Sequence, residues 1–439
     1  MAIENLKHSI NDLTAKISVI GLGYVGLPVA ASFAEKRFDV LGIEVKPERV
    51  EMINQGISPI EGKEPGLSEL LAKVVGEKKL HATTDYNQLK DRDIILIDVE
   101  TPVDNTNTPR YEALKNSLRH LGPVLKSGAL VIIESTIAPG TMQDLVHPIL
   151  EESSGFKLNT DFYLGNCPER VMPGKLLANL KTMSRVVGGS TPETATTMIA
   201  LYRHVVQADL DPVDWITAEL VKTTENAYRD VQIAFANEVA LICETLGANV
   251  WEVRELVNKT PFRYMHLPGT GVGGHCIPKD PWLLAYSARG MGVPIRLISA
   301  AREINNSMPL HTADLAQQAL SEVGQELSGA KILVMGFSYL EDTDDTRNSP
   351  SEVLASHLQE KKASVVIHDP FVAGYQGNIL QMADGCDTAI VMVAHSEYRL
   401  LDLKALKSVL RTPVLVDGRN VYDPGMAVEA GLIYKGIGR

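Results

Sequence analysis

The sequence lacks the features that mark several common classes of protein. Only four cysteines occur among its 439 residues, and their scattered positions form neither a disulfide framework nor the paired spacing of a zinc site. This usage favours a reducing compartment. The longest apolar runs, such as residues 129–133, are far shorter than the roughly 20 residues of a membrane-spanning helix. Residues 1–16 mix polar and charged side chains, so we expect no signal peptide, no metal site and a cytoplasmic location.

The chain also lacks an excess of positive charge. Its 42 lysines and arginines are outnumbered by 54 aspartates and glutamates, which gives a formal net charge of −12. Nucleic acid and an anionic membrane surface would both repel such a protein, so we expect neither as a partner. Net charge describes the whole surface, however, and a small anionic molecule can still bind in a local cationic pocket.

The first part of the chain predicts a doubly wound domain. Hydrophobic residues make up 45% of the sequence and charged residues 22%, as in ordinary globular proteins, and the length indicates about two to four domains. Up to about residue 205, short apolar runs alternate with helical patterns, which is typical of a buried parallel sheet. The predicted strands here are 17–20, 40–43, 94–99, 130–133 and 162–164.

The middle of the chain predicts an unusually long helix. Asp214 can cap a helical pattern over 217–246 that contains neither glycine nor proline before Gly247 ends it. Such a helix far exceeds the usual length of about 11 residues, and helices of this kind commonly span between domains or lie in a subunit interface. A second helix is predicted over 250–257.

The last part of the chain returns to alternating strands and helices. Its predicted strands are 332–335, 365–367, 389–393 and 414–416. The first turn, residues 336–339, has no glycine triplet, so we expect this domain to bind a ligand other than a dinucleotide. The predicted fold is therefore α/β, with two doubly wound Rossmann-like domains joined by a helical central domain with a long helix. We place these domains at 1–205, 206–308 and 309–439.

A glycine-rich turn directly after the first predicted strand indicates a dinucleotide site. Gly21 permits the tight turn, Gly23 lets the backbone approach a pyrophosphate, and Gly26 allows close packing of helix on strand. Glu44 ends the next strand, where an acid holds the ribose hydroxyls and repels a 2′-phosphate, so NAD is favoured over NADP. An exposed strand-end carboxylate is the alternative for Glu44. Arg49 is either a contact on the adenosine side or a solvated surface arginine.

One cysteine, Cys276, lies in a glycine-lined segment with a lysine and a carboxylate. Gly273 and Gly274 precede it, and Lys279 and Asp280 follow it by three and four residues. A thiol on such a loop, near cationic and acidic groups, is a candidate nucleophile. A buried structural thiol is the competing interpretation, and local sequence leaves the two nearly balanced. Asp280 is either a general base or a helix N-cap.

Polar residues of the predicted long helix form a second candidate group. Lys222 and Asn226 are four residues apart and share one face, and Arg229 lies near that face. A lysine and an amide aimed at one cleft can stabilise a developing alkoxide and hold a sugar hydroxyl, although solvated helix residues are the simpler interpretation. The remaining cysteines are predicted to be structural: Cys167, Cys243 and Cys386.

Together these patterns resemble the UDP-glucose/GDP-mannose dehydrogenase family, whose members oxidise a nucleotide sugar at C6 from alcohol to acid. The resemblance extends from Gly21 to Arg419 and rests on several independent motifs in one order. Besides the glycine turn and the cysteine segment, these motifs are Glu134–Gly140, Cys167–Val171, Ala218–Lys222 and Asp345–Pro350.

The resemblance implies that Cys276 attacks the C6 aldehyde left by a first hydride transfer. A second hydride transfer would turn the thiohemiacetal into a thioester, which water hydrolyses to the uronic acid, so two NAD molecules are reduced in sequence. Residues that match those handling the alcohol proton and the oxyanion are Lys222, Asn226 and Asp280. Residues that match groups near the nicotinamide and the hydrolytic water are Thr136 and Glu169.

The resemblance also implies binding residues for NAD and for a UDP-sugar. The cofactor contacts would be Gly21, Gly23, Tyr24, Val25, Gly26, Glu44, Arg49, Thr101, Thr136 and Arg347. The sugar-nucleotide contacts would be Arg170, Val171, Lys222, Asn226, Arg229, Gly273, Tyr339 and Arg419. Family members usually receive one arginine from a neighbouring subunit, for which Arg263 is the nearest candidate, and we expect a homodimer or higher homo-oligomer.

Two features of the sequence bear on the identity of the substrate. Family members usually carry a substrate-binding lysine after the tyrosine of the third-domain turn, but here Tyr339 is followed by Leu340. His275 and Pro278 resemble the branch that acts on UDP-N-acetylhexosamines, with N-acetyl-D-mannosamine ahead of N-acetyl-D-glucosamine, and UDP-glucose is a further alternative. The competing hypotheses are a two-electron dehydrogenase that does not use Cys276, and a catalytically silent sensor of NAD and nucleotide sugars.

Overall fold

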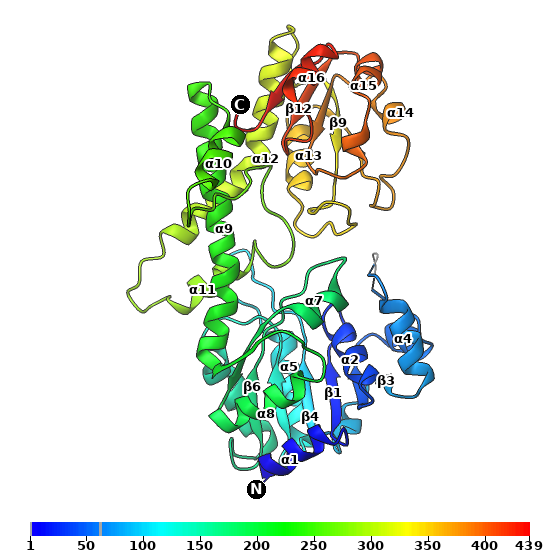
Figure 1. The fold of residues 1–439 in the computed structure, drawn as a ribbon, viewed down its shortest axis with the longest axis vertical. Coiled ribbons are helices and arrows are strands. Elements are labelled where there is room, and N and C mark those ends of the chain that lie inside the picture. The colour runs from blue at the N-terminus through cyan, green and yellow to red at the C-terminus, as the bar shows by residue number, and fades with distance from the viewer. Residues whose placement is uncertain (1, 61–63) are drawn as a thin grey trace. The chain divides into compact units, whose positions relative to one another are not determined.

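The computed structural model describes residues 2–60 and 64–439, and the chain divides into two compact units. One unit is Met1–Glu225 with Trp282–Gly292, and the other is Asn226–Pro281 with Val293–Arg439. Each unit contains one mainly parallel sheet with helices against both of its faces, as Figure 1 shows. The predicted fold class is therefore confirmed, whereas the three domain boundaries remain a prediction.

The first unit has an eight-stranded sheet in the order β3-β2-β1-β4-β5-β6-β7-β8. All neighbouring strands are parallel except β6 and β7, which are antiparallel. The order 3-2-1-4-5-6 is that of a dinucleotide-binding sheet. In chain order the strands are β1 (Lys16–Ile20), β2 (Asp39–Ile43), β3 (Leu80–Thr83), β4 (Ile94–Ile97), β5 (Leu130–Ile133), β6 (Tyr163–Asn166), β7 (Arg185–Gly189) and β8 (Leu210–Asp214).

Two apolar clusters lie against the two faces of this sheet, so its central strands are buried on both sides. That burial explains why strands such as β4 and β5 are uniformly apolar. The helices of this unit are α1 (Ala2–Asn11), α2 (Gly26–Glu35), α3 (Pro47–Asn54), α4 (Leu67–Gly76), α5 (Glu112–Leu121), α6 (His147–Ser154), α7 (Leu176–Thr182) and α8 (Pro192–Tyr202).

The five predicted strands of this sheet are present, and their ends lie within two residues of those predicted. Three strands were not expected. β3 and β8 are edge strands, and β8 consists of Leu-Asp-Pro-Val-Asp, which has no apolar run. A proline is tolerated there because an edge strand needs fewer ladder hydrogen bonds. β7 contains a buried arginine, Arg185, which interrupts the apolar pattern.

The long helix α9 spans Trp215–Leu246 and confirms the prediction. Asp214 caps it, since its carboxylate accepts the Thr217 amide at 2.9 Å. Gly247 follows with φ 69°, a left-handed conformation that ends the helix without the cost that a side chain would add. The predicted second helix is α10 (Val250–Asn258). Helix α11 (Asp280–Ser287) begins at the end of the cysteine segment.

The second unit has a five-stranded, wholly parallel sheet in the order β10-β9-β11-β12-β13. Its strands are β9 (Lys331–Met335), β10 (Ser364–His368), β11 (Thr388–Val391), β12 (Val414–Asp417) and β13 (Ile433–Gly436). Its remaining helices are α12 (Leu297–Ser321), α13 (Pro350–Glu360), α14 (Ile379–Ala383), α15 (Leu403–Val409) and α16 (Pro424–Glu429). The edge strand β13 was not expected.

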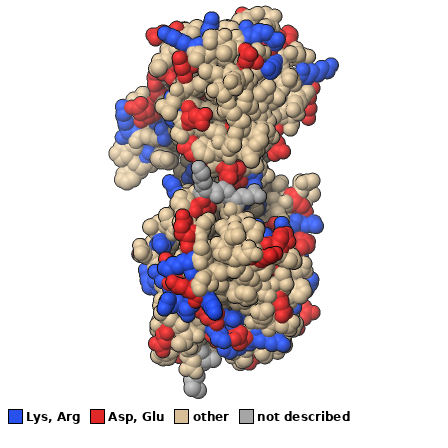
Figure 2. Space-filling view, turned by 90° about the vertical axis from the view of Figure 1, so that its right-hand side faces the viewer, with Lys and Arg blue, Asp and Glu red and all other residues tan. Residues whose placement is uncertain are grey.

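The surface carries both signs of charge. In the face shown in Figure 2, acidic and basic side chains lie interspersed over each unit. Within the described part of the chain, no helix is both long enough and apolar enough to cross a membrane.

Candidate active site

The glycine turn lies between β1 and α2, and its geometry requires glycine. Gly21 has φ 94°, and a side chain there would meet the Asp98 carbonyl oxygen at 2.6 Å. A Cβ on Gly26 would lie 2.0 Å from the Gly21 carbonyl oxygen, so only glycine lets the helix approach the turn. A Cβ on Gly23 would meet nothing within 4 Å, which leaves that backbone open to a ligand. Tyr24 and Val25, between these glycines, are half-buried.

Glu44 and Arg49 lie beside this turn and are tied to each other. Arg49 donates to the Leu22 carbonyl oxygen at 2.9 Å and lies 3.5 Å from the Glu44 carboxylate. Glu44 follows β2 directly and also accepts the Lys46 amide at 3.1 Å. Arg49 therefore anchors the glycine turn to the acid that follows the neighbouring strand.

The turn thus meets the needs of a bound dinucleotide. Among the described residues no side-chain hydrogen bond caps the N-terminus of α2, so no side chain competes there with an anion for the positive end of the helix. The backbone is open at Gly23, and the carboxylate of Glu44 stands where a ribose would lie. Glu44 and the turn would hold NAD, and the nicotinamide would accept a hydride.

Two predicted threonines meet at the carboxyl edge of the first sheet. The hydroxyl of Thr101 donates to the Thr136 carbonyl oxygen at 2.6 Å. The neighbouring Ser135 hydroxyl donates to the Val99 carbonyl oxygen at 2.6 Å. These bonds join the loops after β4 and β5, where doubly wound proteins bind their ligands.

Glu169 lies against a buried arginine that the sequence did not suggest. Arg185 is 1% exposed, and its guanidinium is 2.6 Å from the Glu169 carboxylate and 3.4 Å from that of Glu134. Tyr202 donates to Glu134 at 2.7 Å, and its ring lies 5.0 Å from the guanidinium carbon. Glu169 is therefore held in place by a charge on β7.

A fourth group, Asp98, completes this buried cluster. Burial and the charge of Glu134 raise the pKa of Asp98 well above its ordinary value. Burial likewise raises the pKa of Glu134, although the charge of Arg185 opposes it. The charge of Glu134 thus disfavours ionisation of Asp98, so the two carboxyl groups resist being charged together. No sequence signal marked Asp98 or Arg185.

Two of the quoted motifs also meet within the first unit. Glu219, on α9, accepts the amides of Gly140 and Met142, both at 2.8 Å. Burial raises the pKa of Glu219 to about 7 against these hydrogen bonds, which lower it. Glu219 therefore fixes the turn that follows Thr136.

Arg170 and Val171 have partners within the first unit. The Arg170 guanidinium pairs with Glu225 and donates to the carbonyl oxygen of Ser184. Val171 is half-buried and packs against the core on one face of the sheet. Lys222 is 8% exposed, so it is not the solvated helix residue that local sequence favoured.

The second unit brings Asn226 together with the cysteine segment. The Asn226 amide group donates to the Asp280 carboxylate at 2.6 Å. Asp280 is fully buried, lies 3.4 Å from the Lys279 ammonium, and donates its own amide to the Cys276 carbonyl oxygen at 2.8 Å. The helix places Lys222 one turn before Asn226 on the same face.

Cys276 is exposed, whereas the other cysteines are buried. Burial raises the pKa of the Cys167 thiol to about 12 and also raises the pKa values of Cys243 and Cys386. The thiolate is the reactive form, so these three cannot act as nucleophiles near neutral pH. Burial lowers the pKa of the neighbouring His275 to about 4, as do the charges of Lys279 and Arg347.

The segment before Cys276 packs against the loop that follows β9. The Gly274 amide donates to the Arg347 carbonyl oxygen at 2.9 Å. A Cβ on Gly273 would lie 2.6 Å from Tyr339 Cβ, and one on Gly274 would lie 2.8 Å from the Tyr339 ring. Tyr339 and Arg347 are thereby placed around the cysteine segment.

The remaining predicted arginines differ in their surroundings. Arg419 donates to the carbonyl oxygens of Met392 and Gly271 at 2.9 and 3.3 Å, and burial lowers its pKa to about 10. Arg229 and Arg263 are exposed. Arg419 therefore fastens the start of the cysteine loop to the second sheet.

Comparisons with known proteins show the family to which the chain belongs. Models of the UDP-glucose/GDP-mannose dehydrogenase family match the chain in three parts: the NAD binding domain over 15–206, the central domain over 216–307 and the UDP binding domain over 333–424. The chain is therefore an NAD-dependent nucleotide-sugar dehydrogenase. It belongs to the UDP-glucose/GDP-mannose dehydrogenase family, as the sequence motifs predicted.

Individual relatives cover nearly the whole chain. It is 38% identical over 424 residues to a UDP-N-acetyl-D-mannosamine dehydrogenase of Pyrococcus horikoshii, covering 97% of this chain and 99% of that one, and the structure of this relative matches with a TM-score of 0.91. It is 35% identical to an NDP-N-acetyl-D-galactosaminuronic acid dehydrogenase of Ralstonia nicotianae, covering 92% and 96% of the two chains. A solved structure with that name from Methanosarcina mazei has a TM-score of 0.87 at 36% identity, covering 100% and 98%.

Proposed function

We propose that the protein oxidises a UDP-N-acetylhexosamine at C6 to the uronic acid in a four-electron reaction, with UDP-N-acetyl-D-mannosamine as the preferred substrate. The observation that carries this proposal is the exposed Cys276 on a glycine loop whose next turn contains the buried Asp280 bound to Asn226. The names of the relatives support an acetamido sugar over UDP-glucose.

The first oxidation requires removal of the C6 hydroxyl proton as hydride leaves C6, with NAD as the hydride acceptor. Lys222, Asn226 and Asp280 would stabilise the alkoxide and pass its proton toward water. The Asn226–Asp280 hydrogen bond fixes the orientation of the amide, so its position is set before substrate binds. The product of this step is the C6 aldehyde.

The second oxidation uses the sulfur. The Cys276 thiolate forms a bond to the aldehyde carbon, and the resulting alkoxide takes up a proton as a thiohemiacetal. Loss of that proton and transfer of a second hydride, for which a second NAD would be the acceptor, gives a thioester. Water then attacks the carbonyl carbon, the carbon–sulfur bond breaks, and the thiol and the carboxylate are released.

Glu169 and Thr136 would lie near the nicotinamide and the hydrolytic water. Glu169 is held by Arg185, so its carboxylate has a fixed position for directing water. Thr136 lies in the loop joined to Thr101 at the carboxyl edge of the sheet. The nucleotide part of the substrate would contact Arg419, Tyr339 and the other residues given in the sequence analysis as sugar-nucleotide contacts.

Measuring NADH formed per sugar consumed tests this chemistry. Two NADH per sugar supports the thioester route, and one NADH would instead favour the two-electron dehydrogenase. A Cys276→Ala variant should form no uronic acid, whereas the matched Cys386→Ala variant should retain acid formation. Steady turnover with any UDP-sugar in a panel of N-acetylmannosamine, N-acetylglucosamine and glucose nucleotides would eliminate the sensor hypothesis and identify the epimer.

The same panel tests the consequence of Leu340. Leu340 is 39% exposed and supplies no cation to a phosphate. Because a lysine at this position would supply that cation, Leu340→Lys should lower KM for the UDP-sugar and leave KM for NAD unchanged.

The self-association of the chain is a further part of the proposal. Helix α9 exposes large apolar side chains: Tyr228 at 62%, Phe235 at 57%, Ile242 at 52% and Leu246 at 75%. An apolar stripe on a long helix fits an interface between copies, and we propose a homodimer. Sedimentation at micromolar concentration should give a dimer, and Phe235→Glu should weaken it.

We also propose a cytoplasmic location, because the exposed thiol of Cys276 suits a reducing compartment.

A further inference from the structure

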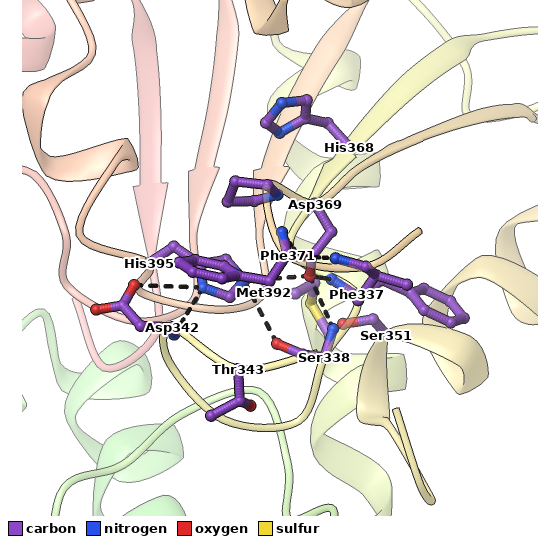
Figure 3. Close-up of polar contacts among 12 residues, drawn as sticks. Phe337, Ser338, Asp342, Thr343, Ser351, His368, Asp369, Phe371, Met392 and His395 are labelled. Atoms are coloured by element: carbon purple, nitrogen blue, oxygen red, sulfur yellow. Dashed lines mark hydrogen bonds and ion pairs between the residues drawn. The ribbon is translucent and has the colours of Figure 1, made fainter. Parts of the chain in front are cut away.

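A buried carboxylate occupies the turn that opens the second sheet. The amides of Phe337 and Ser338, which follow β9, donate to Asp369 Oδ2 at 2.6 and 2.9 Å (Figure 3). The other oxygen of Asp369 accepts the amides of Phe371 and Val372 at 2.8 and 3.1 Å. Burial by itself would raise the pKa of Asp369, but hydrogen bonds from a histidine and these amides lower it to about 2. The protein's own anion therefore binds the amides of the turn that opens the second sheet.

That histidine is His395, which is fully buried in the loop after β11. Its Nε2 lies 3.1 Å from Asp369 Oδ2, and its Nδ1 lies 2.9 Å from the amide nitrogen of Asp342 (Figure 3). A backbone amide can only donate, so Nδ1 accepts and the ring proton on Nε2 points to Asp369. His395 thus joins the carboxylate to a second loop, the one that runs from Leu340 onward.

Asp342 is held through its main chain and its side chain. Its carboxylate accepts the amide and the hydroxyl of Ser396 at 2.9 and 3.0 Å. Its φ of 56° is a left-handed conformation, which aspartate tolerates better than most residues. Three bonds to His395 and Ser396 therefore set the path of the loop at Asp342.

The C-terminal end of the same loop binds the cysteine segment. Arg347 accepts the Gly274 amide at 2.9 Å, and the Asn348 side chain donates to the Gly274 carbonyl oxygen at 3.0 Å. Both backbone polar groups of Gly274 are thus bound to this loop, two residues before Cys276. The ring of Tyr339, at the start of the loop, packs on the same glycine.

We propose that His395 is a positioning residue for Cys276. By accepting the Asp342 amide, His395 holds loop 340–348, and this loop holds Gly274 and so the path of the cysteine segment. The inference deepens the proposed function and rests on Cys276 being the nucleophile. His395 acts through the loop and needs no contact with substrate.

Two substitutions separate the two bonds of the imidazole. His395→Asn can place its amide oxygen near the Nδ1 position and keep the bond to Asp342, while losing the bond to Asp369. His395→Gln can place its amide nitrogen near the Nε2 position and keep the bond to Asp369, while losing the acceptor for Asp342. A role in positioning depends on the Asp342 bond, so the glutamine variant should have the larger effect on Cys276.

Hydrogen exchange of the full-length protein measures this directly. Loss of a hydrogen bond worth about 1.4 kcal/mol speeds local opening about tenfold, so amides of residues 272–278 should exchange about tenfold faster in His395→Gln. Amides of β9 should keep their wild-type rates, because a general loss of stability is not expected. In the same variant kcat should fall about 10- to 100-fold, as expected for a misplaced catalytic group, with a smaller change in KM.

The matched control is His368→Gln. His368 is also fully buried in the second sheet, but its ring contacts the Tyr398 hydroxyl and the Gly377 carbonyl oxygen rather than the loop. It should leave exchange of residues 272–278 unchanged. Equal exchange of that segment in the glutamine and asparagine variants would overturn the inference. Faster exchange with unchanged turnover would also overturn it, because the loop would then not position Cys276 for the reaction, whereas the role of Cys276 as nucleophile is tested separately by Cys276→Ala.

Discussion

Arg185→Met is the most informative single change in the first unit, because it removes the cation from the buried cluster of acids. Arg185 is 1% exposed, and the side chains of its partners Glu134 and Glu169 are 0% and 4% exposed. Methionine fills a similar length but offers no charge, so both carboxylates stay buried without their cation. Breaking a buried ion pair in this way costs about 3–5 kcal/mol.

That cost has a measurable equivalent in hydrogen exchange. Since about 1.4 kcal/mol corresponds to a factor of ten, amides of β5 and β6 that open only with the whole unit should exchange about two to four orders of magnitude faster. The matched control is Arg110→Met, whose side chain is 54% exposed and lies 3.5 Å from Asp104. An exposed pair of this kind contributes at most about 1 kcal/mol, so the control should change exchange less than about tenfold.

The pH dependence of the stability lost in Arg185→Met gives a second check. The pKa values of Asp98 and Glu134 are raised even with Arg185 present, and removing the arginine raises them further. A carboxyl group whose folded pKa exceeds its unfolded value favours folding below the unfolded pKa and loses that contribution as pH rises through the folded pKa. The deficit of Arg185→Met should therefore be larger at pH 8 than at pH 5. An increase in exchange rate of less than tenfold would refute the ion-pair reasoning. An increase that is equal at pH 5 and pH 8 would refute it too.

Three further substitutions test the two loops that hold ligand and nucleophile. Gly26→Ala should abolish NAD binding in calorimetry, because its Cβ would lie 2.0 Å from the Gly21 carbonyl oxygen, and unchanged affinity would contradict the close helix approach. Glu44→Gln should raise KM for NAD about tenfold through loss of a charged hydrogen bond, and an unchanged KM would place the ribose elsewhere. Gly273→Ala should alter the rate at which iodoacetamide alkylates Cys276, since its Cβ would lie 2.6 Å from Tyr339 Cβ; equal rates in variant and wild type would show that the loop absorbs the methyl group.

The sequence alone predicted the parts of this protein whose physics is local. A glycine turn between a strand and a helix, an acid after the next strand, and an uninterrupted helix over 217–246 each follow from spacing and residue type. The predicted ends of these elements lie within one or two residues of those observed. The family resemblance added proposed roles for Cys276 and Asp280, and the structure shows Asp280 hydrogen-bonded to Asn226.

Tertiary structure decided what depends on burial and on distant partners. Arg185, Glu219 and His395 are single polar residues in apolar or mixed surroundings, and nothing in their neighbours predicts the groups they meet. The edge strand β8 was missed because its pairing comes from β7 rather than from an apolar pattern. Local sequence specifies local conformation. The free-energy cost of burying a charge or an amide, however, is offset by a partner that lies far away in the sequence. Only the folded chain shows which residue that partner is.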